Sequence, residues 1–100
     1  MQKISIIIPK NNNDGRPFPE DRIRSIELEL LKISGGYSRY DVTGQWIDGG
    51  KIYTDISFKY DLIVTSDQAD LVKTVVSGAK TALNQLSMYF EEQETKLLFL

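Results

Sequence analysis

Residues 35–64 read GGYSRYDVTGQWIDGGKIYTDISFKYDLIV, and this stretch decides the fold. Two runs rich in β-branched and aromatic residues flank Asp48-Gly49-Gly50, as is typical of two strands joined by a turn. An Asp-Gly step supplies the positive φ angles that a tight hairpin turn requires. The sequence therefore predicts a long β-hairpin that turns at these three residues.

Apolar and polar residues alternate along both predicted strands. Before the turn, one phase of the alternation contains Tyr40, Val42, Gly44 and Trp46. After the turn, the apolar phase contains Ile52, Ile56, Phe58, Tyr60, Leu62 and Val64. A period of two places one face of a sheet against a core and leaves the other in water. We therefore expect both sets to share the core face, with Trp46 packed beneath the helices.

The residues of the opposite phase are expected to share the second face of the hairpin. They include charged side chains and one tyrosine: Arg39, Asp41, Tyr53, Asp55, Lys59 and Asp61. Charges of opposite sign that face each other across two strands stabilise a sheet without any chemistry. We keep Arg39, Asp41, Tyr53, Asp55 and Lys59 as candidate site residues on the sheet face and assign no catalytic residue.

A strand and a helix are predicted on each side of the hairpin. Residues 3–8 (KISIII) form the first strand, and Pro9 ends it because proline lacks a backbone donor. The first helix has an apolar stripe made of Ile23, Ile26, Leu30 and Ile33. The second helix begins at Thr65 and Gln68, which have the spacing of a capping box.

The C-terminal residues 86–100 allow two interpretations. Leu86, Met88 and Phe90 alternate as in a fourth strand, and residues 96–100 (KLLFL) would form a fifth. The alternative is that the second helix continues through this segment. We favour the strand, which gives the order β-α-β-β-α-β. This is a two-layer ferredoxin-like sandwich of the α+β class, an antiparallel sheet with both helices on one face, in a single domain spanning residues 1–100.

Composition excludes several classes of protein. The net charge of −2 and the pI near 5.0 argue against a nucleic-acid-binding protein, which requires a basic patch. The chain has no cysteine and no histidine, so neither disulfides nor thiolate or imidazole metal sites are expected. We expect no metal and no cofactor. No apolar run is long enough for a signal peptide or a membrane span, which predicts a cytoplasmic location and no membrane partner.

Short motifs in the hairpin resemble a family of small bacterial α+β proteins of unknown function. In that family a strand, a loop and a helix precede a Gly-x-Thr/Ser element and then Gly-x-Trp. The matching residues here are Gly35-Gly36-Tyr37-Ser38 and Gly44-Gln45-Trp46, and Gln85 follows the second helix. The resemblance covers residues 4–90, implies the ferredoxin-like fold and carries no activity. The Asn-rich loop at residues 11–13 and the apolar tail after Thr95 depart from it.

The loop before the first helix is a candidate anion site. Gly15 and Arg16 lie in this loop, and Arg22 and Arg24 follow at the start of the helix. Helix starts present free N–H groups and positive potential, which favour bound anions. The pattern of a nucleotide-binding phosphate loop is absent. We name these four residues as the candidate ligand-binding set for a small anion.

Apolar residues exceed the needs of one small core, and they indicate self-association. The surplus comprises Leu28, Leu31, Tyr37, Tyr53, Ile63 and residues 97–100. An exposed apolar patch is typical of an association surface. The sequence therefore favours a non-enzymatic, homo-oligomeric module that binds a protein or a small ligand, such as an accessory or inhibitor protein of a phage or mobile element. The alternative is a small enzyme with a Tyr/Arg/Asp site on the sheet face, an analogy from the fold alone.

Overall fold

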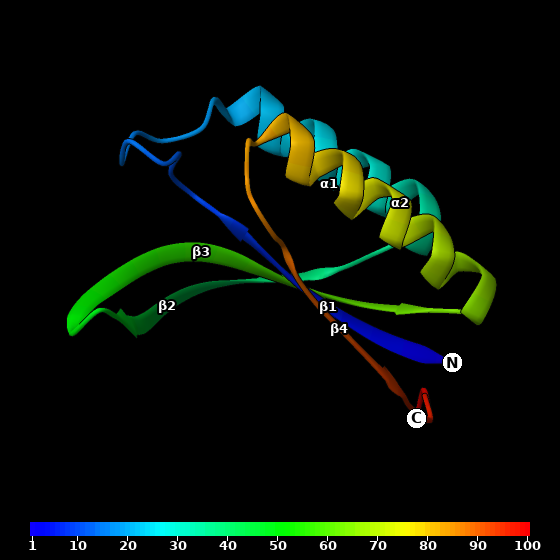
Figure 1. Cartoon of the computed structure of the whole chain (residues 1–100). Coiled ribbons are helices and arrows are strands. Elements are labelled where there is room, and N and C mark those ends of the chain that lie inside the picture. The colour runs from blue at the N-terminus through cyan, green and yellow to red at the C-terminus, as the bar shows by residue number, and fades with distance from the viewer.

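A computed structural model describes residues 1–100 and contains four strands and two helices (Figure 1). The elements are, in order, β1 (Gln2–Pro9), α1 (Glu20–Ser34), β2 (Ser38–Asp48), β3 (Lys51–Val64), α2 (Ser66–Ala82) and β4 (Tyr89–Glu94). The strands form one antiparallel sheet in the order β2-β3-β1-β4. Both helices cover the same face of this sheet (Figure 1). The predicted ferredoxin-like α+β sandwich is confirmed.

The hairpin turns where the sequence predicts. Asp48 pairs with Lys51, so that Gly49 and Gly50 alone form the loop. Their φ angles of +57° and +78° lie in the left-handed region that favours glycine. Positive φ at both central residues is the geometry of a type I′ turn, whose twist matches that of the flanking strands.

The register of the hairpin contradicts the predicted core face. Because the loop has two residues, every odd-numbered residue of β2 lies opposite an even-numbered residue of β3. Arg39 therefore lies opposite Tyr60, and Tyr40 lies opposite Lys59. Residues directly opposite each other share a face of the sheet. The prediction that Tyr40, Val42 and Trp46 share a face with Phe58 and Tyr60 is wrong.

The helix face is the one covered by α1 and α2, and the open face is the opposite one. Trp46 lies on the open face, where half of its surface (50%) is exposed and its ring stacks on Tyr53 at a centroid distance of 4.5 Å. Its Nε1 donates a hydrogen bond to Asp55 Oδ2 at 2.8 Å. The predicted core position of Trp46 is therefore wrong.

The core lies between the helix face and the two helices. The most deeply buried side chains come from β1, β3, both helices and the residue that follows α2: Ile4, Ile6, Ile8, Leu30, Tyr60, Leu62, Val64, Ala69, Val72 and Leu83. The predicted stripe of α1 is confirmed, since Ile23, Ile26 and Leu30 are buried and Ile33 packs against them. The predicted capping box is also present. Thr65 Oγ1 accepts from the Gln68 amide and Gln68 Oε1 accepts from the Thr65 amide.

The C-terminal segment contains one strand, and α2 ends at Ala82. β4 pairs antiparallel with β1, from Gln2 opposite Glu94 to Ile7 opposite Tyr89. A fourth strand is thus present, but it begins at Tyr89, so that Leu86 and Met88 of the predicted alternation lie before it. The predicted fifth strand is wrong, because residues 95–100 form no regular element. Four apolar tail residues are exposed: Leu97, Leu98, Phe99 and Leu100. Neither helix of the chain is long and apolar enough to cross a membrane.

Two leucines of α1 allow a matched test of this packing. Leu30 is fully buried (0% exposed), whereas Leu28 on the same helix is 44% exposed. Leu30→Ala should reduce the free energy of unfolding by about 2–5 kcal/mol, because it removes buried methyl groups and leaves a cavity. Leu28→Ala should cost less than about 1 kcal/mol. Urea denaturation followed by circular dichroism measures both, and equal losses would contradict this placement of α1.

Candidate functional site

The four residues predicted to bind an anion do not converge in the structure. Gly15 lines a pocket on the open face, Arg22 lines a pocket beside the loop that follows α2, and Arg24 lines a pocket on the helix face. The loop itself is closed by local bonds. Asn12 Oδ1 accepts from the Asp14 and Arg16 amides at 2.9 and 3.0 Å, and the Asn12 amide donates to the Arg16 carbonyl. An anion site at these four residues remains a prediction.

The five sheet-face candidates lie on two faces of the sheet. Arg39 and Asp41 share the helix face with Tyr60 and Phe58, their partners in the register. The other three candidates lie on the open face: Tyr53, Asp55 and Lys59. The two-residue turn is the reason, since it opposes odd positions of β2 to even positions of β3. The expectation that these five residues share one face is therefore wrong.

A buried carboxylate on α1 is the centre of the polar cluster on the helix face. The Glu27 side chain is 5% exposed. Its Oε2 accepts hydrogen bonds from the Tyr60 hydroxyl at 2.6 Å and from Arg39 Nη1 at 2.9 Å. Its Oε1 accepts from Arg24 Nη1 at 3.2 Å. Three elements, α1, β2 and β3, thus meet at one side chain.

These contacts fix the protonation states of the cluster. Burial alone would raise the pKa of Glu27, but the hydrogen bonds from Tyr60, Arg39 and Arg24 outweigh burial and lower this pKa below its ordinary value. Burial and the hydrogen bond to Glu27 raise the pKa of Tyr60. Glu27 is therefore a carboxylate and Tyr60 a neutral donor over the whole physiological range.

The sequence contains a signal for Glu27 within the apolar stripe of α1. Glu27 lies one residue after Ile26 and four after Ile23, so it falls within the apolar face of α1. A charged residue in that position must have partners of opposite charge or hydrogen-bond donors once it is buried. Arg24 at i−3 was a visible partner, whereas Tyr60 and Arg39 are distant in sequence.

The Glu27 pocket opens beside this cluster on the helix face. It has a volume of about 620 Å³. Its lining combines cations, acids and apolar side chains, among them Lys10, Phe18, Arg24, Glu27, Arg39 and Phe58. The Arg39 guanidinium lies 4.4 Å and Lys10 Nζ lies 4.7 Å from the centre of the Phe58 ring. Lys10 also forms an ion pair with Asp41 at 2.8 Å.

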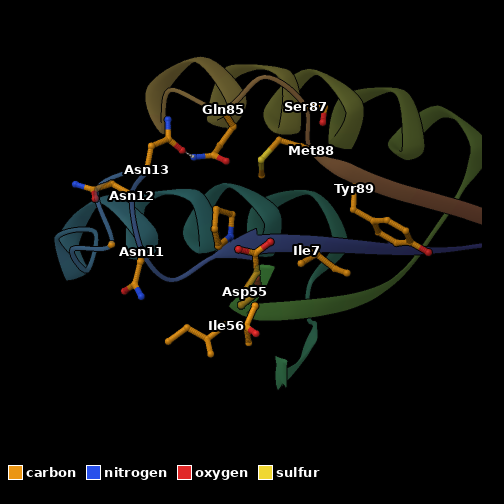
Figure 2. Close-up of a pocket in the computed structure, with 14 residues that line it drawn as sticks. Ile7, Asn11, Asn12, Asn13, Asp55, Ile56, Gln85, Ser87, Met88 and Tyr89 are labelled. Atoms are coloured by element: carbon orange, nitrogen blue, oxygen red, sulfur yellow. Dashed lines mark hydrogen bonds between the residues drawn. The ribbon is translucent and has the colours of Figure 1, made fainter. Parts of the chain in front are cut away.

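The open-face pocket has a volume of about 460 Å³ and is shown in Figure 2. The end of β1, the middle of β3, the Asn-rich loop and the segment before β4 form it. Its polar lining consists of a carboxylate, amides and hydroxyls: Asp55, Asn11, Asn12, Asn13, Gln85, Ser57, Ser87 and Tyr89. Gln85 Nε2 donates to Asn13 Oδ1 at 3.4 Å, which joins the two loops across the pocket (Figure 2).

Hydrogen-bonding and charged side chains line both pockets. No group of three or more acidic side chains is placed to hold a metal ion, and histidine and cysteine are absent. Asp55 lies in the open-face pocket with its carboxylate toward the cavity (Figure 2). The same carboxylate accepts from Trp46 Nε1. The pocket is thereby joined to the stacked Trp46 and Tyr53 of the hairpin.

The fold and its strand order define the chain as a ferredoxin-like α+β protein. It is similar to a phage SAM lyase in complex with S-methyl-5'-thioadenosine, with a TM-score of 0.71 and 16% identity over 93% of this chain and 80% of that one. The PII-like protein CutA from Nostoc sp. PCC 7120 gives a TM-score of 0.68 and 14% identity, over 95% and 81% of the two chains. The periplasmic divalent cation tolerance protein CutA from Archaeoglobus fulgidus gives a TM-score of 0.71 and 15% identity, over 99% of this chain and 88% of that one.

These similarities concern the fold, because the identities are low. No protein-family model and no curated protein sequence matches the chain. The resemblance to the small bacterial family with a Gly-x-Trp hairpin is therefore supported in its fold and not in its motifs.

The lowered pKa of Glu27 predicts a specific acid dependence of stability. A carboxylate whose pKa is lower in the folded state stabilises the fold above its ordinary pKa of 4.5, and this contribution disappears as the pH falls through the lowered value. At pH 7, Glu27→Gln should reduce the free energy of unfolding by about 1.5–3 kcal/mol, the usual worth of hydrogen bonds to a charged group. The deficit should shrink below pH 4.5, because the wild-type protein then loses the same interaction.

The matched control for this prediction is Glu29→Gln, an exposed carboxylate of the same helix. Urea denaturation at a series of pH values measures the free energy of unfolding of all three proteins. A deficit of Glu27→Gln that does not change between pH 7 and pH 3 would contradict the assignment.

Proposed function

We propose that this chain is a self-associating binding protein whose hairpin contacts a second copy and whose open-face pocket holds a small polar ligand. The observation that carries the proposal is that the turn end of the hairpin pairs with no other strand of the sheet. β1 pairs with β3 between Ser57 and Val64 only. Residues 44–55, called the hairpin arm, therefore pair with each other alone, and Figure 1 shows them reaching beyond the helices.

The hairpin arm exposes apolar side chains on both of its faces. Ile47 and Ile52, directly opposite each other on the helix face, are 68% and 64% exposed. Trp46 and Tyr53 lie stacked on the open face. A two-stranded hairpin without further cover is only marginally stable in water. Contact with another molecule would remove this exposure, which is why the arm supports an association surface.

A second copy of the chain is the proposed occupant of this surface. The apolar tail is a second exposed segment, and the outer edges of β2 and β4 have no partner strand. One copy thus offers both an apolar arm and unpaired strand edges that another copy can cover. The arm adjoins the open-face pocket through Asp55, so a neighbour that covers Trp46 would also enclose that pocket.

The open-face pocket suits a ligand with several hydroxyl and amine groups. The Asp55 carboxylate accepts from hydroxyls, and the side-chain amide of Asn11, which bonds to no protein atom, both donates and accepts. Tyr89 adds an aromatic ring to the lining. The S-methyl-5'-thioadenosine bound to the phage SAM lyase has two ribose hydroxyls and an adenine amine, and it is the first compound that we propose for this pocket.

The enzymatic alternative is less well supported. It requires Arg39, Asp41, Tyr53 and Asp55 to gather in one pocket. The register places Arg39 and Asp41 on the helix face, whereas Tyr53 and Asp55 lie on the open face. This separation favours binding over catalysis at the sheet-face candidates.

Self-association can be tested with the double variant Ile47→Lys, Ile52→Lys. Sedimentation velocity at tens of micromolar should show a dimer or larger assembly for the wild-type protein and a monomer for the variant, because two lysines would have to be desolvated in the contact. Leu71→Lys is the control, since Leu71 is exposed on α2 and away from the hairpin arm. A wild-type monomer, or a variant that assembles like the wild type, would contradict the proposal.

Ligand binding can be tested by titration calorimetry with S-methyl-5'-thioadenosine. Asp55→Asn should weaken binding about tenfold or more, because it removes the charge that accepts the ligand hydroxyls. Asp48→Asn in the turn is the control and should bind like the wild type. Absence of binding to the wild-type protein would contradict the choice of ligand. Chromatography would detect any conversion of S-adenosylmethionine by the protein, and such conversion would contradict the non-enzymatic function.

A further inference from the structure

We propose that the Glu27 pocket is a second ligand site, one that binds a small aromatic carboxylate. The site is independent of self-association and of the open-face pocket. The two pockets lie on opposite faces of the sheet, and they share only Asn11, in the loop after β1, and Ile56, within β3.

Two arginines supply the donors of the proposed site. Arg24 and Arg39 both reach Glu27 through Nη1. Their Nε and Nη2 groups donate to no protein atom. Both arginine side chains are about half exposed, and both residues line the pocket. A guanidinium presents its remaining N–H groups in a planar fork that matches the two oxygens of a carboxylate.

The charge on the floor of the pocket favours an anion. One buried carboxylate, Glu27, faces the two guanidinium groups, so the cluster keeps one positive charge in excess. Lys10 at the rim is already paired with Asp41. Glu20 and Asp41 are exposed to solvent, which screens their charges more strongly than those at the floor.

Glu27 also holds the arginine forks in place. Its hydrogen bond from Tyr60, at 2.6 Å, fixes the carboxylate from beneath. The two arginines are thereby anchored by one nitrogen each, which reduces the side-chain entropy that a ligand has to overcome.

The walls of the pocket favour a flat apolar body on the same ligand. Phe18 is buried, and Phe58, Ile23 and Ile56 complete the apolar lining. An aromatic ring gains from edge or offset contact with a phenylalanine in addition to the surface it buries. The volume of about 620 Å³ lies within the usual range of small-molecule sites. A free inorganic anion would leave these walls in contact with water.

Phenylacetate and its neutral isostere phenylacetamide distinguish the parts of this proposal. Titration calorimetry or chemical-shift perturbation on the full-length protein should show phenylacetate binding at least about tenfold more tightly than phenylacetamide. It should show no comparable affinity for inorganic phosphate. Equal affinities of phenylacetate and phenylacetamide would overturn the role of the arginines. Phosphate that binds as tightly as phenylacetate would overturn the role of the apolar walls.

Arg24→Gln should weaken phenylacetate binding by about tenfold or more, while Arg39 and Tyr60 still hold Glu27. Lys32→Gln is the matched control, because Lys32 is an exposed cation on the same helix and lies outside this pocket. The melting temperatures of both variants, measured alongside, show that they are folded. Phenylacetate binding that is unchanged in Arg24→Gln, or that is absent from the wild-type protein, would overturn the proposal. Asp55 lies outside the Glu27 pocket, so Asp55→Asn should leave phenylacetate binding unchanged. A negative result at one pocket therefore does not decide the result at the other.

Discussion

The register fixed by the Gly49-Gly50 turn decides which side chains of the hairpin reach the helices. With two residues in the loop, Arg39 lies opposite Tyr60, and both side chains point toward α1. A shift by one residue would move every side chain of a strand to the other face. Arg39 would then leave the helix face, and Glu27 would keep only one of its two arginine partners. The positive φ angles of the two glycines therefore matter for a polar cluster far along the strands from the turn.

That cluster joins the two layers of the fold. Glu27 belongs to α1, Arg39 to β2 and Tyr60 to β3, and Tyr37 packs edge-on against the Tyr60 ring at 5.1 Å. A buried carboxylate with this many partners specifies one arrangement of its elements, because any other would leave the charge without compensation. The same geometry leaves N–H groups of each guanidinium without a protein partner beside the Glu27 pocket. A feature that stabilises the fold and a feature able to recognise a ligand thus share one set of atoms.

Local patterns predicted the elements of this fold, whereas the faces and the site required the pairing of distant residues. The Asp-Gly-Gly turn, the stripe of α1 and the Thr65–Gln68 box are all short-range signals, and all three are confirmed. Trp46 was assigned to the wrong face although the correctly predicted turn implied the register. Its apolar surface is met by Tyr53 instead of by a helix. The two pockets could not be predicted, because each combines segments that are close in space and far apart in the chain.

The central position of β1 has a consequence for the order in which the chain folds. β1 lies between β3 and β4, and its first paired residue, Gln2, lies opposite Glu94. Pairing β1 with β4 closes the whole chain between Gln2 and Glu94 into a loop. This closure costs more entropy than forming the hairpin, whose strands are joined by two residues. During synthesis the first strand emerges long before its partner β4. The hairpin can assemble locally, but one edge of β1 stays without hydrogen bonds until Tyr89–Glu94 has left the ribosome.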